Sequence, residues 1–355
     1  MKIGLDQYTV HHLGLDARSL LDFAAGRGLE GVQFSSPLQL SPTLDAGEIR
    51  AAREYADQLD LYLELGIPSV NPHQAAAQFR TEAGAFADRL EELMRAAASA
   101  GVQSLRTFIG AQFQRQPDAV VCRMDDLERD SARPDVPWDC QLADTTAVLQ
   151  RLAPVARELD VRLAVEPHLD ATSFQLLRMI EAVGPDVAGI CLDTANVMLR
   201  LEDPLEAARR LAPYVVMTHV KDAALLFHET GLRWQCRPCG QGSVPLPEIV
   251  TELARYAPDL TLSIEDHAGL FELPIYDADW IATFPDLTTG ELALLLRRAW
   301  TTGRRLSSRR PEDPEVLETI PWAEKVLPRL DAAVRYLRDL LEELELESEL
   351  TVETA

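Results

Sequence analysis

The chain has 355 residues, of which 47% are hydrophobic, so it is long and apolar enough to bury a sizeable core. Its 34 Lys and Arg residues stand against 57 Asp and Glu residues, which gives a formal net charge of −23. Such an acidic surface repels DNA, RNA and anionic lipid, because phosphate binding requires clustered cations. We therefore predict a small-molecule partner, and neither a nucleic-acid nor a membrane partner.

The first residues and the cysteines predict a cytoplasmic protein. The opening sequence MKIGLDQYTV lacks the apolar core of a signal peptide, and no stretch approaches the roughly 20 apolar residues of a membrane span. Five cysteines, an odd number in a long chain, do not indicate a disulfide scaffold.

Short apolar runs alternate with longer amphipathic segments along most of the chain. The runs predict eight strands, at residues 2–8, 31–36, 61–66, 102–110, 161–168, 188–196, 215–222 and 260–267. The segments with apolar residues at helical spacing predict helices at 17–28, 86–101, 144–160, 172–184, 203–214, 246–257 and 289–303.

This alternation predicts a single (β/α)8 TIM barrel of the α/β class over residues 1–306. A doubly wound sheet is the alternative, but it normally carries a glycine-rich turn after the first strand, and LDQYTVHHLG has none. Two long links, at 111–142 and 223–245, follow strands and are expected on the carboxyl-terminal face, where barrel active sites lie.

An acidic helical extension is expected over residues 307–355. One helical stripe runs along it, and we expect this stripe to cover barrel surface, with an oligomer contact as the alternative. The stripe consists of Val326, Leu330, Val334, Leu337, Leu341 and Leu344.

Four consecutive predicted strands end in side chains that bind metals: Glu166, Asp193, His219 and Glu265. In a barrel, neighbouring strand ends surround one point, so these side chains are expected to converge. Three carboxylates packed together would repel one another, and a divalent cation resolves that conflict. Oxygen-rich ligands with one nitrogen suit Mn2+, Mg2+ or Co2+ better than a thiolate-bound zinc.

The motifs VEPH, CLDTAN, THVKD, GQG and IEDH, in this order, resemble the sugar phosphate isomerase/epimerase group of xylose isomerase-like TIM barrels. This group includes ketose 3-epimerases, inosose dehydratases and sugar-acid decarboxylases. The resemblance covers roughly residues 1–305 and implies one divalent metal, usually Mn2+, bound by Glu166, Asp193, His219 and Glu265. Members of this group also often form homo-oligomers.

The resemblance implies an isomerase or epimerase of carbohydrate metabolism that removes a proton next to a carbonyl. The metal would stabilise the resulting enediolate, and Glu166 and Glu265 would remove and return the proton from opposite sides. Asn196 stands where ketose 3-epimerases usually have a histidine. A lyase that decarboxylates or eliminates from a 3-keto sugar or sugar acid therefore remains the alternative.

Further side chains are candidates for contact with a keto-sugar substrate. His168 and Lys221 lie two residues beyond predicted ligands, and we predict that both assist catalysis. The remaining candidate substrate residues are Asn196, His267, Glu64, Arg106, Arg233 and Arg237. A single CxxC, at Cys236 and Cys239, cannot complete a four-ligand zinc site, so we expect loop packing there.

The sequence disfavours two other classes of protein. A DNA-repair endonuclease of this barrel type would need a histidine-rich trinuclear cluster and a basic face, which seven histidines and a charge of −23 disfavour. A binding protein without turnover is disfavoured by the presence of both candidate proton-transfer glutamates.

Overall fold

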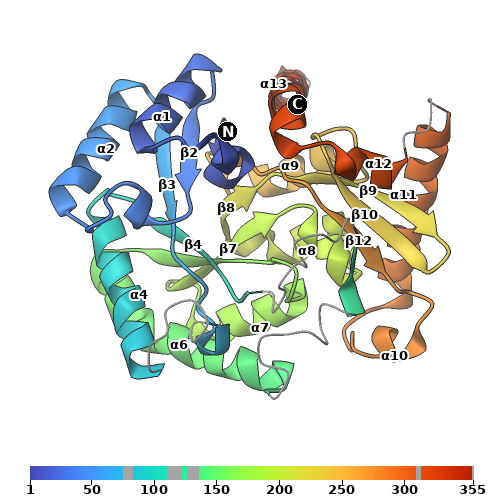
Figure 1. The fold of residues 1–355 in the computed structure, drawn as a ribbon, viewed down its shortest axis with the longest axis horizontal. Helices are drawn as coiled ribbons and strands as arrows, with labels where there is room; N and C mark the ends of the chain where they lie inside the picture. The colour runs from blue at the N-terminus through green and yellow to red at the C-terminus, as the bar shows by residue number, and fades with distance from the viewer. Residues whose placement is uncertain (75–82, 111–120, 126–135, 309–312, 354–355) are drawn as a thin grey trace.

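The computed structural model describes residues 1–74, 83–110, 121–125, 136–308 and 313–353. Eight parallel strands form one sheet in the order β11-β1-β2-β3-β4-β6-β7-β8 (Figure 1). An isolated bridge between Val220 and Ile264 connects the end of β8 to β11 and closes the sheet. The (β/α)8 barrel is therefore confirmed, and the doubly wound alternative is excluded. The barrel strands are β1 (Lys2–Asp6), β2 (Gly31–Phe34), β3 (Tyr62–Gly66), β4 (Ser104–Phe108), β6 (Arg162–Glu166), β7 (Ala188–Asp193), β8 (Val215–His219) and β11 (Thr261–Ile264).

Helices surround the barrel, and side-chain caps set where several of them begin. Asp45 accepts hydrogen bonds from the backbone of Gly47 and Glu48 at the start of α2, and Thr172 forms a capping box with Gln175 at the start of α7. Every helix among the described residues is too short or too polar to cross a lipid bilayer. The barrel helices are α1 (Ala17–Gly26), α2 (Ala46–Gln58), α4 (Ala83–Ala98), α6 (Trp138–Leu159), α7 (Ser173–Val183), α8 (Pro204–Leu211) and α9 (Leu246–Ala254), with the short turns η1 (Gln7–Leu13), η2 (Pro37–Gln39), η3 (Asn196–Arg200) and η4 (Ala212–Tyr214).

A second sheet lies beside the barrel, where sequence analysis expected an irregular link at 223–245. Its strands are β5 (Cys122–Arg123), β12 (Leu270–Leu273), β10 (Gly231–Arg237) and β9 (Asp222–His228), in that order (Figure 1). Gly231 begins β10 at a φ of +146°, where an added Cβ would lie 2.2 Å from the Leu273 carbonyl oxygen. Trp234 is fully buried and donates to the Ala195 carbonyl (3.2 Å), which ties this sheet to the loop after β7. Of the other predicted link, residues 111–120 and 126–135 lie outside the described residues.

Of the helices that follow the eighth barrel strand, some pack against the second sheet and one packs against the barrel. Helix α11 (Thr289–Ser307) packs against β9, and Arg298 pairs with Asp203 at the start of α8. The short helices α10 (Ala278–Ile281) and α12 (Pro314–Thr319) flank it in the sequence, and α12 contacts β12. Residues 289–303 are therefore helical as predicted, but the helix packs against β9 of the second sheet.

The last helix, α13 (Trp322–Glu353), packs against β1 and η1 of the barrel (Figure 1). Trp322 Nε1 donates to the Thr9 carbonyl oxygen (2.9 Å), and Arg329 forms two hydrogen bonds with the Asp266 carboxylate (2.7 and 2.8 Å). The predicted stripe thus covers barrel surface: Val326, Leu330, Val334 and Leu337 are buried in the main core, and Leu341 and Leu344 are half-buried against it.

The lower barrel interior is built around one tyrosine. Tyr62 points across the barrel, and its Oη lies 2.8 Å from Ser263 Oγ. Gly4 and Gly31 make room for this ring, because an added Cβ would lie 1.9 Å from Tyr62 Oη at Gly4 and 2.1 Å from its ring carbons at Gly31. The two glycines in β1 and β2 therefore allow a polar side chain to cross a space that aliphatic residues usually fill.

Candidate active site

Four side chains converge at the carboxyl-terminal end of the barrel. Glu166 ends β6, Asp193 ends β7, His219 ends β8 and Glu265 follows β11. Asp193 and His219 are register partners in adjacent strands, so their side chains leave the sheet at the same level. One potential ligand atom from each of the four lies within 4.8 Å of the others, and all four residues are buried.

Three buried atoms in this group make no hydrogen bond: Glu166 Oε1, His219 Nδ1 and Glu265 Oε2, of which the last forms an ion pair with Lys221 (2.8 Å). His219 Nδ1 lies 3.2 Å from Glu166 Oε1 and 3.1 Å from Glu265 Oε2. Buried polar atoms without partners are costly and rare. A cation bound between these three atoms would satisfy them together, so the donor set fits a divalent metal.

The fourth member of the group, Asp193, is held by both of its oxygens. Its Oδ1 accepts hydrogen bonds from the backbone of Ala195 (2.9 Å) and Asn196 (2.8 Å), which fixes the carboxylate. Its Oδ2 lies 2.7 Å from Lys221 Nζ, and the same ammonium lies 2.8 Å from Glu265 Oε2. Lys221 is fully buried and therefore serves as a fixed positive charge between two of the candidate ligands.

The charges around the group favour a divalent cation. Besides its three carboxylates, Asp6 lies 3.5 Å from His219 Nε2, so four carboxylates are present. Two cations oppose them: Lys221, and Arg106, whose Nε donates to Glu166 Oε2 (2.6 Å). When His219 is neutral, as a metal-binding imidazole must be, a cation carrying two charges would balance the site. An uncompensated pair of charges in a buried site is unfavourable.

The surrounding charges shift the pKa values of the carboxyl groups in opposite directions. Burial opposes ionisation of Glu166, but the charges of Arg106 and His219 outweigh it and lower the pKa of that carboxyl. Burial likewise opposes ionisation of Glu265, and Lys221 and His219 hold its pKa well below the usual range. For Asp193, burial raises the pKa to about 6, although Lys221 acts against it. Both glutamates are thus ionised at neutral pH.

The three histidines nearest the group differ in charge. Burial lowers the pKa of His168 and of His267 to about 4, so both rings are neutral at physiological pH. Burial also disfavours the charged form of His219, but nearby anionic groups, including Glu166 and Glu265, raise its pKa well above the usual value. Two neutral imidazoles are therefore available to exchange hydrogen bonds with a polar ligand.

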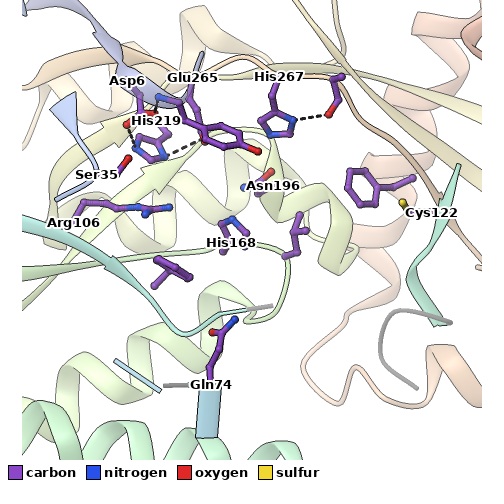
Figure 2. A pocket seen from close by; sticks show the side chains of 15 residues that line it. Asp6, Ser35, Gln74, Arg106, Cys122, His168, Asn196, His219, Glu265 and His267 are labelled. Atoms are coloured by element: carbon purple, nitrogen blue, oxygen red, sulfur yellow. Dashed lines mark hydrogen bonds and ion pairs between the residues drawn. The ribbon is translucent and has the colours of Figure 1, made fainter. Parts of the chain in front are cut away.

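A pocket of about 400 Å³ opens onto this group. Figure 2 shows that Arg106, His168, His219, Glu265 and His267 lie around one space. Polar groups and rings share the wall, an arrangement that suits a small polar ligand with C–H faces. The lining residues are Asp6, Tyr8, Ser35, Gln74, Arg106, Phe108, Cys122, His168, Leu169, Asn196, His219, Glu265, His267, Ala268 and Phe271.

The structure brings most of the predicted substrate residues to the pocket. Asn196, His267, His168 and Arg106 line it, and Lys221 Nζ lies 3.4 Å from Asn196 Oδ1. Glu64 is placed differently: its carboxylate points into the barrel interior and accepts a hydrogen bond from Gln33 Nε2 there.

Arg233 and Arg237, which were candidate substrate residues, do not line the pocket. Both lie on β10, and the guanidinium of Arg233 is engaged by Glu272 (2.8 Å) and Glu315 (2.9 Å). Arg237 donates to Gln235 on the same strand (2.7 Å). These two arginines are kept away from the pocket by the hairpin of β9 and β10. A flexible loop could turn them toward the pocket, but the hydrogen bonds between the strands fix their positions. Cys236 and Cys239, in the same region, are buried free thiols.

Sequence reasoning missed two groups of pocket residues. Asp6 ends β1 as the candidate ligands end their strands, but the first strand was predicted to run to residue 8, so the same argument did not select Asp6. Phe271 and Cys122 reach the pocket from β12 and β5 of the second sheet. No local sequence pattern indicates that pairing, because it joins segments about 150 residues apart.

Comparison with known proteins places these features in context. A model of the xylose isomerase-like TIM barrel family matches residues 21–283. A segment of 120 residues is 28% identical to the uncharacterised protein YihM of Escherichia coli K12, covering 33% of this chain and 37% of that protein. A segment of 86 residues is 29% identical to 3-oxo-isoapionate decarboxylase of Pectobacterium atrosepticum, covering 24% of this chain and 31% of the enzyme. The matches span about a third of the length of these relatives. The structure of D-psicose 3-epimerase from Clostridium cellulolyticum H10 aligns with a TM-score of 0.55 at 15% identity, over 88% of this chain and all of that one, which shows a shared fold.

Proposed function

This chain belongs to the xylose isomerase-like TIM barrel family, and on that premise we propose that it is a divalent-metal-dependent isomerase or epimerase of a keto-sugar. The observation that carries the proposal is the convergence of three buried atoms that make no hydrogen bond, Glu166 Oε1, His219 Nδ1 and Glu265 Oε2, at one point in the pocket.

The metal would be held by Glu166, Asp193, His219 and Glu265. When bound, it would act as a Lewis acid that polarises the substrate carbonyl and makes the neighbouring C–H bond more acidic. Three carboxylates and one imidazole favour Mn2+, with Mg2+ or Co2+ as alternatives.

The protein's own groups would carry the proton. Glu166 and Glu265 are both ionised, and each has one oxygen near the candidate metal position, so either can accept the proton next to the carbonyl. Return of a proton from the other carboxyl group, after that group has taken up a proton from solvent, would invert or move the stereocentre, and the first carboxyl group would then release its proton to solvent. Arg106 and Lys221 would favour the enediolate formed between these steps, because both are cations beside the carboxylates.

The neutral groups on the pocket wall would position the sugar. His168 and His267 can each donate one hydrogen bond and accept another, and Asn196 offers an amide. Tyr8, Phe108 and Phe271 supply ring faces for the C–H surface of a sugar. A volume of about 400 Å³ is within the range of small-molecule sites.

A lyase is the second candidate, and the two buried cations favour it. Arg106 lines the pocket, and Lys221 adjoins its wall, so a substrate carboxylate would find a positive charge. Loss of CO2 from a 3-keto sugar acid leaves an enolate, which the same site would stabilise. The partial similarity to 3-oxo-isoapionate decarboxylase supports this alternative.

Metal content of the purified protein tests the metal site. We expect about one Mn2+-like ion per chain in the wild type and none in Asp193→Ala. The matched control is Asp186→Ala, which removes an exposed aspartate that pairs with Arg157 on the surface and should retain the ion. A wild-type protein that neither contains an ion nor is stabilised by Mn2+, Mg2+, Co2+ or Zn2+ would refute the proposal.

The reaction type is tested with the metal-loaded enzyme in D2O. An isomerase or epimerase incorporates deuterium next to the carbonyl of a keto-sugar and releases no carbon. A decarboxylase releases CO2 from a keto-sugar acid in proportion to substrate consumed. Glu265→Gln serves as the control for protein-dependent exchange, since it lacks one proton-transfer carboxylate.

A further inference from the structure

Gln33 contacts His219 from the barrel interior and has no role in the proposed chemistry. We propose that Gln33, held in place by Glu64, is a positioning residue that keeps a proton on Nε2 of His219, so that Nδ1 is free to bind the metal. The inference rests on the proposed function, since it assumes that His219 is a metal ligand.

The hydrogen bond between Gln33 Oε1 and His219 Nε2 is the first observation. It lies inside the barrel, where Gln33 is 1% exposed and His219 is 1% exposed, so water cannot replace it. The other ring nitrogen, Nδ1, faces Glu166 and Glu265. One nitrogen of the imidazole therefore faces the barrel interior and the other faces the candidate metal position.

Glu64 determines which end of the Gln33 amide faces the histidine. Gln33 Nε2 donates to Glu64 Oε2 over 2.9 Å, because a carboxylate can only accept. The amide oxygen is then directed at His219. The reversed amide would set an oxygen against the carboxylate and an NH2 group against Nε2. That arrangement would force the proton onto Nδ1 and block metal binding there.

The carboxylate of Glu64 is itself fixed by two hydroxyl groups of one other strand. Thr261 Oγ1 donates to its Oε1, and Ser263 Oγ lies 3.2 Å from its Oε2. Both donors lie on β11, and Ser263 also bonds Tyr62, the ring that crosses the barrel between Gly4 and Gly31. The network thus extends from the barrel floor to a metal ligand.

Asp6, the second neighbour of His219 Nε2, also favours a proton on that nitrogen. Asp6 Oδ2 lies 3.5 Å away and is also an acceptor, while its Oδ1 receives the backbone N–H of Tyr8. Both groups that face Nε2 in the described structure are therefore hydrogen-bond acceptors, and no donor opposes the proton on that nitrogen. Hydrogen bonds of this kind fix the ring orientation and the tautomer of metal-binding histidines.

Mn2+ affinity of the metal-free full-length protein tests this role without using activity. Gln33→Met keeps the length of the side chain and removes the acceptor, and we expect Mn2+ to bind about 10- to 100-fold more weakly. Gln150→Met is the matched control, because Gln150 is an exposed glutamine that bonds only the Ala182 carbonyl at the surface, and its affinity should equal that of the wild type. Circular dichroism and thermal unfolding verify that each variant is folded.

A second variant and a spectroscopic readout keep the inference testable if Gln33→Met is unstable. Glu64→Gln preserves shape but no longer dictates the orientation of the Gln33 amide, so affinity should fall by a smaller factor. In the Zn2+-loaded wild type, NMR of 15N-histidine-labelled protein should show a slowly exchanging proton on His219 Nε2, which exchanges faster in both variants.

The outcomes separate the two proposals. Unchanged Mn2+ affinity and an unchanged Nε2 proton in the folded variants would overturn the role of Gln33 while leaving the metal site intact. A wild-type protein that binds no Mn2+ would refute the proposed function itself, and the positioning role with it.

Discussion

Replacing Lys221 by methionine separates the contribution of this lysine to stability from its effect on the metal. Its ammonium lies 2.7 Å from Asp193 and 2.8 Å from Glu265 in a buried site. Removing one partner of a buried ion pair costs about 3–5 kcal/mol, because the remaining charge stays buried without compensation. For a chain of this size we expect roughly 2 °C of melting temperature per kcal/mol, and hence a decrease of about 6–10 °C in the metal-free protein.

Mn2+ should reverse this loss. A ligand at 100 times its dissociation constant stabilises the folded state by about 2.7 kcal/mol. Lys221→Met leaves Asp193 and Glu265 without their cation, so Mn2+ should bind the variant at least as tightly as the wild type and raise its melting temperature by more. Differential scanning calorimetry with and without Mn2+ measures both effects. Lys325→Met, a lysine outside the site, controls for the substitution. If Mn2+ stabilised the variant less than the wild type, the metal would not share these carboxylates with Lys221.

Three further predictions concern proton transfer, pH and the last helix. Glu166→Gln and Glu265→Gln should each slow deuterium exchange by about 10²–10⁴-fold, and retention of full exchange by either would exclude that carboxylate as an acid–base group. Burial raises the pKa of Glu202 to about 7, so the folded state retains a proton that the unfolded state releases. Stability should therefore fall as the pH rises from about 5 to 8, and urea unfolding should show a flatter dependence for Glu202→Gln. Leu330→Ala, in the fully buried part of α13, should cost about 2–5 kcal/mol in the same assay, and an unchanged stability would mean that α13 does not share the barrel core.

The strand ends were predictable because parallel strands in a barrel leave little freedom. Once the runs before Glu166, Asp193 and His219 are recognised as adjacent strands, their side chains must leave the sheet at one end. The role of Gln33 could not be predicted in this way, because Gln33 lies inside β2 and its partner His219 is 186 residues away in the sequence. A glutamine in a short strand carries no local sign of a role in binding.

The hairpin of the second sheet was missed although its signal is present. In β10, apolar Leu232, Trp234 and Cys236 alternate with polar residues behind a glycine, which is the two-residue period of a strand. Strand β9 lacks that alternation, because its first four residues are all buried between α11 and the rest of the sheet. This affected the predicted site: Arg233 was a candidate substrate residue, whereas on the ladder it pairs with Glu272.

The polar barrel interior is better explained by positioning than by stability. Aliphatic side chains in layers would fill this space with a larger hydrophobic contribution. Here Glu64 and Gln33 occupy it instead, and burial raises the pKa of Glu64 although hydrogen bonds from Thr261, Gln33 and Ser263 favour its ionised form, so keeping this charge inside the barrel costs stability. Two glycines are also required in β1 and β2 to admit Tyr62. A fold retains such an arrangement where it performs a task that apolar residues cannot, and here the network ends on the nitrogen of His219 that must keep its proton. Repacking the interior with aliphatic residues should therefore raise the unfolding free energy and weaken Mn2+ binding in the same variant.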